Sequence, residues 1–215
     1  NRNGSLIRFS CCKDYFNGAK SVETKPLTQK KRIYLLKVPL DILYPDNFEE
    51  AIKEMLHSEG LHQIILLNFT DFMRARRNSE FLQCLQNASL VIPLSPALIK
   101  GASFLKKEVP VRYMPFQFSI RLLGILEKMH KSLYILGQKR ASLEIIENNL
   151  KGSFPELKIV GRYAGYYPKE IEKDILLSIK KSSPSLLLAG HGIAGNNLWV
   201  FRNMKNFNPG LFLWC

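Results

Sequence analysis

Residues 132–160 read SLYILGQKRASLEIIENNLKGSFPELKIV, and this stretch decides the fold class of the chain. The apolar run Leu133–Leu136 has the length of a buried strand, Ala141–Leu150 keeps helical spacing, and Lys158–Val160 starts another short apolar run. A strand, a helix and a strand in this order predict a βαβ unit with parallel strands. Both apolar runs are continuous, as expected for strands that are covered on both faces.

The same alternation continues on both sides of this stretch. It predicts an α/β fold, Rossmann-like, with a mostly parallel sheet and helices on both faces. Pro93 weakens one of the expected strands, as proline does in a sheet. The other expected strands are Arg32–Val38, Gln63–Leu67, Leu90–Leu94, Leu186–Ala189 and Leu211–Trp214. The first of the other expected helices is capped by Asp46, with Glu49 three residues later, and ends at Gly60. Further helices are expected after Thr70, with an interruption near Asn78, at Phe118–Met129, at Lys169–Lys181 and near Asn196–Lys205. Ser95–Gly101 is expected to be a helical turn, and Val109–Pro115 a loop or an edge strand.

The amino-acid composition limits the classes of protein to which the chain can belong. The chain has 215 residues, of which 46% are apolar and 23% charged, so we expect a soluble globular protein with one substantial domain. Residues 1–30 contain six basic residues against two acidic ones and lack periodicity, which predicts a loosely ordered basic arm ahead of an α/β domain at 31–215. The four cysteines form no disulfide framework, and no signal-peptide pattern is visible, so we expect a cytoplasmic location.

The net charge of +13 favours an anionic partner, and the alternative is a basic surface that is simply solvated. Nucleic acid, acidic lipid headgroups and phosphorylated substrates all satisfy this charge. We disfavour nucleic acid because the sequence has no RNA-recognition signature and no interleaving of aromatic and basic residues.

Ligands of a parallel α/β sheet bind beyond the carboxyl ends of its strands, and two glycine turns occupy such positions. Gly190–Gly195 has the G-x-G-x-x-G spacing of a phosphate-binding turn, although no acidic residue follows Asp174 to hold the ribose of NAD. Gly137 is followed by Gln138, Lys139 and Arg140 at the expected start of a helix, where two cations suit a bound anion or else extend into water.

Side chains suited to acid–base or metal chemistry are scarce in the expected ligand loops. His191 is the histidine placed there, where it is a ligand contact or an ordinary turn residue. Asp71 is the one acidic residue in or beside these loops, and it serves as a weak candidate for a catalytic base or simply belongs to the first helical turn. No cysteine or carboxylate cluster completes a metal site, and we predict neither a metal nor a cofactor.

Several stretches resemble the WecG/TagA/CpsF family of bacterial glycosyltransferases over about residues 31–215. They are KVPLDILYPDNFEEAIKEML with its opening strand and Val-Pro-Leu-Asp turn, LLNFTDFMRARRNSEFLQCLQNASLVIPL, SLYILGQK, NNLKGSFPELKIVGRYAGYY, LLLAGHG and NNLW. This resemblance implies a Rossmann-like fold and transfer of an N-acetylhexosamine-type sugar from a UDP-sugar to a polyprenyl-linked acceptor in cell-surface polysaccharide synthesis. It also implies a position at the inner face of the membrane, against an anionic surface.

The resemblance carries candidate binding residues over to this chain. The diphosphate would lie near Gly137 and Gly190–Gly192, Asn68 would orient the sugar or the acceptor, and Arg112 would pair with an anionic group. The candidate substrate-binding residues, taken from the resemblance and from the glycine turns and ligand loops together, are Asn68, Arg112, Gly137, Gln138, Lys139, Gly165, Tyr166, Gly190, His191, Gly192 and Asn196.

The sequence departs from the family pattern at the catalytic positions. Leu94 stands where the family has its proposed catalytic Asp, and Ala194, Asn196 and Asn197 replace the Pro, Gln and Glu of the Gly-x-Gly-x-Pro-x-Gln-Glu-x-Trp motif. From the resemblance we also expect the chain to lack the basic membrane-binding tail of the family. An alternative interpretation is therefore a pseudoenzyme that acts as a binding or assembly module for a protein partner.

Overall fold

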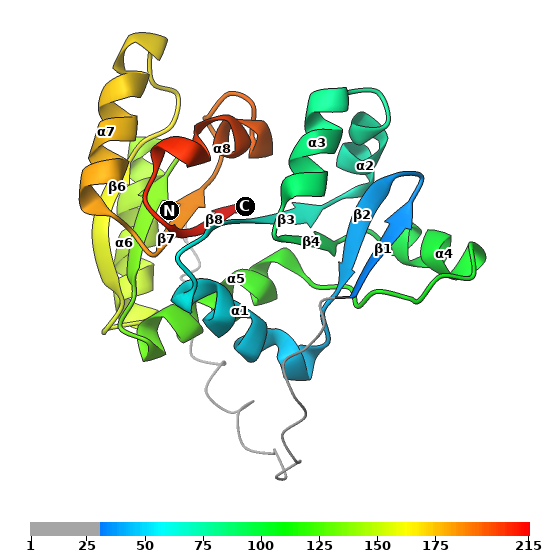
Figure 1. The fold of residues 1–215 in the computed structure, drawn as a ribbon. Helices are drawn as coiled ribbons and strands as arrows, with labels where there is room; N and C mark the ends of the chain where they lie inside the picture. The colour runs from blue at the N-terminus through cyan, green and yellow to red at the C-terminus, as the bar shows by residue number, and fades with distance from the viewer. Residues whose placement is uncertain (1–30) are drawn as a thin grey trace, which may run out of the picture.

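A six-stranded sheet forms the centre of the molecule (Figure 1). The computed structural model describes residues 31–215, so the arm expected at residues 1–30 lies outside the described residues. The strand order is β4-β3-β8-β7-β5-β6 and every neighbouring pair is parallel, which confirms the predicted α/β class. The strands are β3 (Leu61–Leu67), β4 (Leu90–Pro93), β5 (Ser132–Leu136), β6 (Lys158–Tyr163), β7 (Leu186–Ala189) and β8 (Gly210–Trp214).

Helices cover both faces of this sheet, as predicted (Figure 1). Along each central strand, alternate side chains enter cores on opposite faces, and Ile64 and Ile65 of β3 show the alternation. One face packs against α1, α5 and α6, and the other against α2, α3, α7 and α8. The helices are α1 (Phe48–His57), α2 (Phe69–Ala75), α3 (Ser79–Asn87), α4 (Pro96–Phe104), α5 (Pro115–Lys128), α6 (Arg140–Ser153), α7 (Glu172–Ser182) and α8 (Asn197–Asn203), with short 3₁₀ turns η1 (Pro45–Asn47), η2 (Lys169–Ile171) and η3 (Met204–Asn206).

The first predicted strand is wrong as a single element. The run Arg32–Val38 is divided between β1 (Lys31–Leu35) and β2 (Val38–Ile42), which pair antiparallel as a separate hairpin. Leu36 and Lys37 form its two-residue turn with φ of 49° and 72°, a left-handed conformation that neither residue type favours. The segment that the family resemblance marked as a Val-Pro-Leu-Asp turn is therefore a buried strand.

Asparagines rather than aspartates cap the well-defined helix starts. Asn68 and Asn78 each accept a hydrogen bond from a backbone N–H of the first turn of α2 and α3, and the break predicted near Asn78 is confirmed. Asp46 is not the cap of α1, because it lies within η1 and the helix starts two residues later at Phe48.

Candidate functional site

The carboxyl ends of the six parallel strands lie along one edge of the sheet, and the predicted ligand loops gather there. In sheet order, this edge carries Ser95 after β4, Asn68 after β3, Cys215 after β8, Gly190 after β7 and Gly137 after β5. Neighbouring strands are about 4.8 Å apart, so the ends of β3 and β5 are separated by about 14 Å. The sequence-predicted residues thus form two groups, one at β3 and β4 and one at β5, β6 and β7.

The second group is built on a glycine corner, by which we mean Gly137, Gly165, Gly190 and Gly192. These residues bring three loops into backbone contact, with no room for larger side chains. A Cβ atom on Gly137 would lie 2.8 Å from the carbonyl carbon of Gly190, and one on Gly165 would lie 2.7 Å from the carbonyl oxygen of His191. Gly137 also has a φ of 121°, a conformation reserved for glycine.

Hydrogen bonds between the loops use several amides of this corner. The Gln138 amide donates to His191 O at 2.5 Å, the Gly165 amide to Gln138 O at 2.9 Å and the Tyr166 amide to Gly192 O at 2.6 Å. These amides therefore cannot bind a phosphate without breaking the corner. The glycines are explained by loop packing, whatever ligand the corner holds.

Donors for an anion remain at the start of α6, beside this corner. Its first amides have no partner within the helix, and Lys139 provides no side-chain cap. Lys139 and Arg140 are exposed, no acidic residue occupies the first turn, and neither side chain forms an ion pair with any residue in 31–215. Positive charges at a helix N-terminus oppose the helix dipole, so a bound anion would relieve an unfavourable arrangement.

The remaining predicted residues of this group surround the corner on exposed loops. Tyr166 is 67% exposed with a φ of 58°, and His191 is also exposed. Asn196 precedes α8 and makes no side-chain cap, so Gly190 and Gly192 do not themselves begin that helix.

Two hydrogen bonds connect Asn68 and Asp71 at the end of β3. Asn68 Oδ1 accepts from the Asp71 amide at 2.7 Å, and Asn68 Nδ2 donates to Asp71 Oδ2 at 2.9 Å. Partial burial raises the pKa of Asp71, while Arg74 and the bond from Asn68 oppose the rise. Both polar atoms of the Asn68 side chain are thus engaged within the first turn of α2.

Arg112 lies at the end of β4, although it follows α4 by several residues. Its Nε donates to the carbonyl oxygen of Leu94 at 2.6 Å, which leaves the two terminal guanidinium nitrogens without a hydrogen bond to residues 31–215. Leu94 itself is partly buried against the core beneath the edge, and its side chain has no group that can accept a proton.

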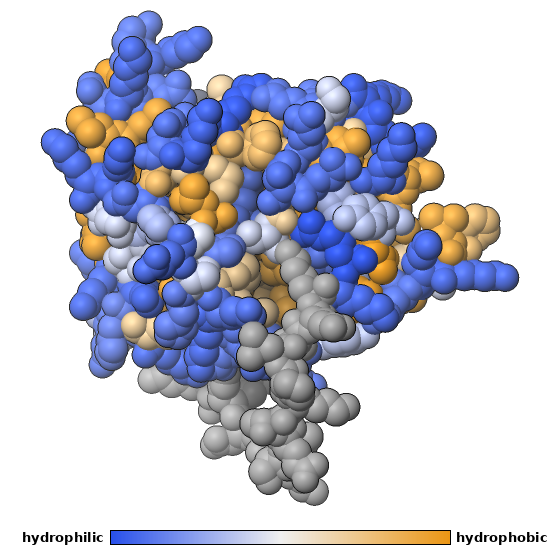
Figure 2. Space-filling view, viewed as in Figure 1, coloured by the Kyte–Doolittle hydropathy of each residue, from blue (hydrophilic) through white to orange (hydrophobic). Residues whose placement is uncertain are grey.

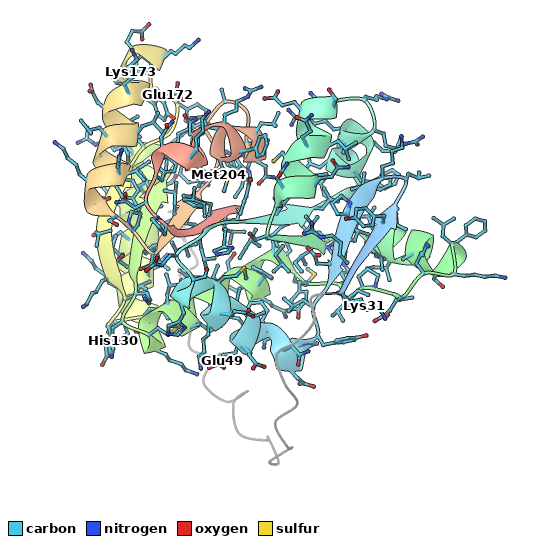
Figure 3. All side chains as sticks on the ribbon, in the orientation of Figure 1. Lys31, Glu49, His130, Glu172, Lys173 and Met204 are labelled. Carbon is cyan, nitrogen blue, oxygen red and sulfur yellow. The ribbon has the colours of Figure 1, made fainter. Side chains whose placement is uncertain are left out.

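The structure adds a cluster that sequence reasoning missed, formed by Tyr167, Glu172 and Trp199. Glu172 begins α7 and accepts from Trp199 Nε1 at 2.5 Å; Figure 3 labels it at the upper end of that helix. The buried Tyr167 hydroxyl meets the geometry of a hydrogen bond with no residue in 31–215, and burial together with the Glu172 charge raises the pKa of Tyr167 to about 12, against an opposing contribution from Trp199. The available signal was Trp199, which matches the last residue of the family's glycine motif.

Histidines and metal-ligating groups do not converge. His57, His62 and His130 all lie near the amino ends of strands, and Figure 3 shows His130 far from Glu172. Within residues 31–215, no three His, Cys, Asp or Glu side chains gather as a metal site would require. Two surface hollows are lined by single helices, one by α7 and the other by α1 together with Asp46 of η1, away from the edge loops.

Comparison with known proteins agrees with the motifs at this edge. A comparison with individual curated sequences found no match. Residues 33–215 match the family described as "Glycosyl transferase WecG/TagA/CpsF family". That match covers almost every described residue, from the hairpin to the end of β8, and the chain therefore belongs to this family of glycosyltransferases.

Proposed function

We propose that the protein binds a UDP-sugar of the N-acetylhexosamine type and transfers the sugar to a polyprenyl-linked acceptor in cell-surface polysaccharide synthesis. The observation that carries this proposal is the position of Lys139 and Arg140, which form no ion pair within residues 31–215, at the start of α6 beside the glycine corner. The diphosphate would bind the free amides of that helix start and these two side chains. Gln138, Tyr166 and His191 lie on the loops of the glycine corner and, together with Asn196 ahead of α8, would contact the nucleotide.

The group at β3 and β4 would receive the sugar and the acceptor. Arg112 retains guanidinium nitrogens for an anionic group, such as an acceptor phosphate, while Asn68 and Asp71 stand at the neighbouring strand end. The separation of about 14 Å between the ends of β3 and β5 suits an extended ligand that crosses the edge, rather than a small one held at a single loop.

In the proposed reaction, the residues at the start of α6 and the residues at the end of β3 have different roles. An acceptor hydroxyl attacks the anomeric carbon, the bond from that carbon to the phosphate oxygen breaks, and UDP leaves with the bonding electron pair. Lys139 and Arg140 would stabilise the charge that develops on the diphosphate. The hydroxyl proton would pass to Asp71, whose raised pKa favours accepting it, or to a phosphate oxygen of the departing UDP.

A second function is favoured by one specific observation, the leucine at position 94. With no carboxylate there, and with Asp71 engaged by Asn68, the same fold could retain ligand or partner binding without turnover. In that case the protein would be a pseudoenzyme that recruits a protein partner.

A thermal-shift titration with UDP, UDP-N-acetylglucosamine and NAD tests the donor site directly. A ligand that binds only the folded protein raises its melting temperature by mass action. We expect stabilisation by both uridine compounds and none by NAD; an unchanged melting temperature with all three contradicts a donor site. Release of UDP in the presence of a polyprenyl-linked acceptor analogue then separates an active transferase from a pseudoenzyme.

A further inference from the structure

The end of α4 carries the most exposed large apolar side chain among residues 31–215. Phe104 is 85% exposed and Leu105 is 45% exposed, and the flanking Lys100, Lys106 and Lys107 are exposed as well. We call these five residues the α4 tip. Figure 2 shows hydrophobic and hydrophilic surface next to each other at the right side of the molecule, where Figure 1 places α4.

The α4 tip is fixed by its own backbone. Lys106 adopts a left-handed conformation with φ of 52°, and the amides of Leu105, Lys106 and Lys107 donate to carbonyl oxygens of Gly101, Ser103 and Ala102 at 2.9–3.1 Å. This is an ordered helix end of the kind that closes many helices. Because this backbone is already ordered, Phe104 and Leu105 can contact a partner without a further loss of backbone conformational entropy.

Core packing does not account for these apolar residues. The inner side of α4 is already occupied, because Leu98 and Ala102 are buried in the core that contains Leu35 of the hairpin. Phe104 and Leu105 are exposed and belong to none of the hydrophobic cores formed by residues 31–215. Exposed apolar side chains of this size on an ordered turn mark an interaction surface.

The charge around the α4 tip indicates which kind of partner it would bind. Between residues 81 and 126 the sequence has five basic residues and a single acidic one, Glu108. Glu108 is paired with Lys31 and accepts a hydrogen bond from Tyr44 at 3.1 Å. The three lysines of the tip are therefore not neutralised by the one nearby carboxylate.

The chain that leaves the tip connects it to the candidate site. On the way to Arg112 and α5, it exposes Val109 at 45%, Met114 at 49% and Phe116 at 57%. Phe69, beside Asn68 at the end of β3, is 47% exposed. Apolar side chains thus accompany the chain from the α4 tip to the part of the sheet edge where we place the acceptor.

We propose that the α4 tip docks the protein on an anionic phospholipid bilayer, with Phe104 and Leu105 entering the headgroup and acyl boundary and the three lysines contacting lipid phosphates. Exposed aromatic and aliphatic side chains set among lysines are the pattern of interfacial membrane binding. The proposal deepens the proposed function and rests on it only in placing a lipid-linked acceptor near Arg112. No helix of residues 31–215 could span a bilayer, so this docking is peripheral for the described part of the chain.

Vesicle flotation of the full 215-residue chain tests the proposal. Vesicles of neutral phosphatidylcholine are compared with vesicles in which about 40% of the lipid is phosphatidylglycerol. We expect binding to the anionic vesicles that weakens with salt. Replacing Lys100, Lys106 and Lys107 by glutamine should reduce the partition coefficient about 100-fold, and Phe104→Ser should reduce it further without changing the charge.

A matched control lies on α7, which also exposes an apolar residue among lysines. Leu177 is 49% exposed there, with Lys173, Lys180 and Lys181 exposed around it. Replacing these three lysines by glutamine removes the same charge as in the α4 variant, and Leu177→Ser makes the matching apolar change. We expect both to have much less effect on flotation. Equal losses in the α4 and α7 variants, or no binding of the wild type to anionic vesicles, would overturn the proposal.

Two further measurements keep this result separate from the donor site. Melting temperatures of the variants show whether they fold, and the shift with UDP reports the donor site alone. A tip variant that folds and responds to UDP but no longer floats supports membrane docking. A protein that floats through the tip but ignores UDP refutes the proposed donor site and leaves the docking surface intact.

Discussion

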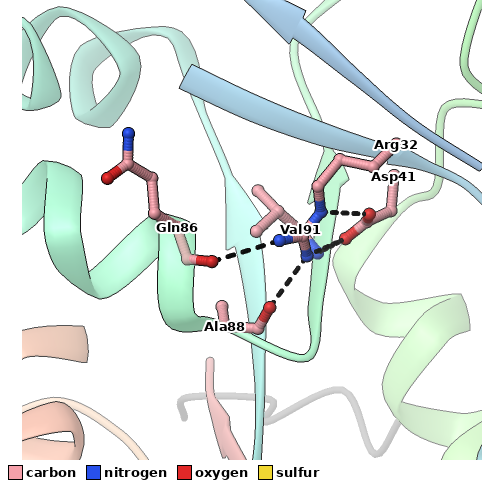
Figure 4. Close-up of polar contacts among 5 residues, drawn as sticks. All are labelled: Arg32, Asp41, Gln86, Ala88 and Val91. Atoms are coloured by element: carbon pink, nitrogen blue, oxygen red, sulfur yellow. Dashed lines mark hydrogen bonds and ion pairs between the residues drawn. The ribbon is translucent and has the colours of Figure 1, made fainter. Parts of the chain in front are cut away.

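Arg32 and Asp41 form a two-pronged ion pair that joins the β1–β2 hairpin to the edge of the main sheet (Figure 4). Arg32 Nε lies 2.7 Å from Asp41 Oδ1, and Nη2 lies 2.8 Å from Oδ2. Asp41 is 1% exposed and also accepts the amide of Val91 in β4, while Arg32 donates to Ala88 O. The hairpin thereby covers an edge strand that would otherwise offer unpaired backbone groups.

Arg32→Ala is expected to destabilise the protein by about 3–5 kcal/mol, because it leaves the Asp41 carboxylate buried without its cation. Arg32→Lys should recover only part of the loss, since an ammonium group cannot reproduce the two parallel bonds. Urea unfolding gives both values. Arg202→Ala, which breaks the exposed pair with Glu80, is the control and should cost far less; equal losses would contradict a special role for the buried pair.

Gly137→Ala tests the glycine corner. The new methyl group would clash with the backbone of Gly190, and alanine is strained at a φ of 121°, so we expect a loss of at least about 2 kcal/mol in unfolding free energy. Gly152→Ala in α6 is the matched control. A Cβ there meets nothing within 4 Å, and alanine in a helix should stabilise by about 0.5–1 kcal/mol. A neutral Gly137→Ala would show that the three loops are not tightly packed.

Tyr167→Phe should leave stability unchanged or increase it slightly, because it removes a buried hydroxyl that makes no hydrogen bond within residues 31–215. Tyr113→Phe makes the same chemical change where the hydroxyl does donate, to Leu43 O at 3.0 Å, and should cost about 1 kcal/mol. Thermal unfolding of the two variants compares them directly. A larger loss for Tyr167→Phe would reveal a partner for its hydroxyl.

Lys139→Gln combined with Arg140→Gln should weaken UDP binding about tenfold to 100-fold, since two charged contacts to the diphosphate are lost. Lys180→Gln with Lys181→Gln removes the same charge at the far end of α7 and should leave the affinity nearly unchanged. Isothermal titration calorimetry with UDP measures both variants. If both variants lose affinity equally, the effect is the net charge of the protein rather than a site at α6.

Asp71→Asn should change how stability depends on pH. Burial raises the pKa of Asp71 in the folded protein, so the folded state holds this proton more tightly than the unfolded state. As pH falls from neutral through the raised pKa toward the ordinary value near 3.8, wild type should gain stability relative to the variant.

Glu49→Gln is the control of opposite sign. Its hydrogen bond with Lys53 lowers the pKa of Glu49, so that carboxylate stabilises the fold at neutral pH and loses its contribution as pH falls. Urea unfolding from pH 4 to 7 follows both variants. Parallel pH profiles for wild type and Asp71→Asn would show that burial does not shift the pKa of Asp71.

The amino-acid sequence by itself determined the α/β class, because strand and helix periodicities are properties of neighbouring residues. The apolar run Leu186–Ala189 is a strand with the predicted ends, and the break before α3 follows from Asn78 as a helix cap. The positions of Asn68 and Gly137 at strand ends also follow from the sequence, since loops after parallel strands share one edge.

Tertiary structure decided what depends on residues far apart in the chain. Leu36 and Lys37 end the first predicted strand early, because Lys31–Leu35 turns back to pair with Val38–Ile42, where Asp41 binds Arg32. The bond between Glu172 and Trp199 depends on the tertiary fold, which places the starts of α7 and α8 together. Local spacing carries no information about such pairings, because their free energy comes from packing and hydrogen bonds that exist only when the whole sheet is assembled.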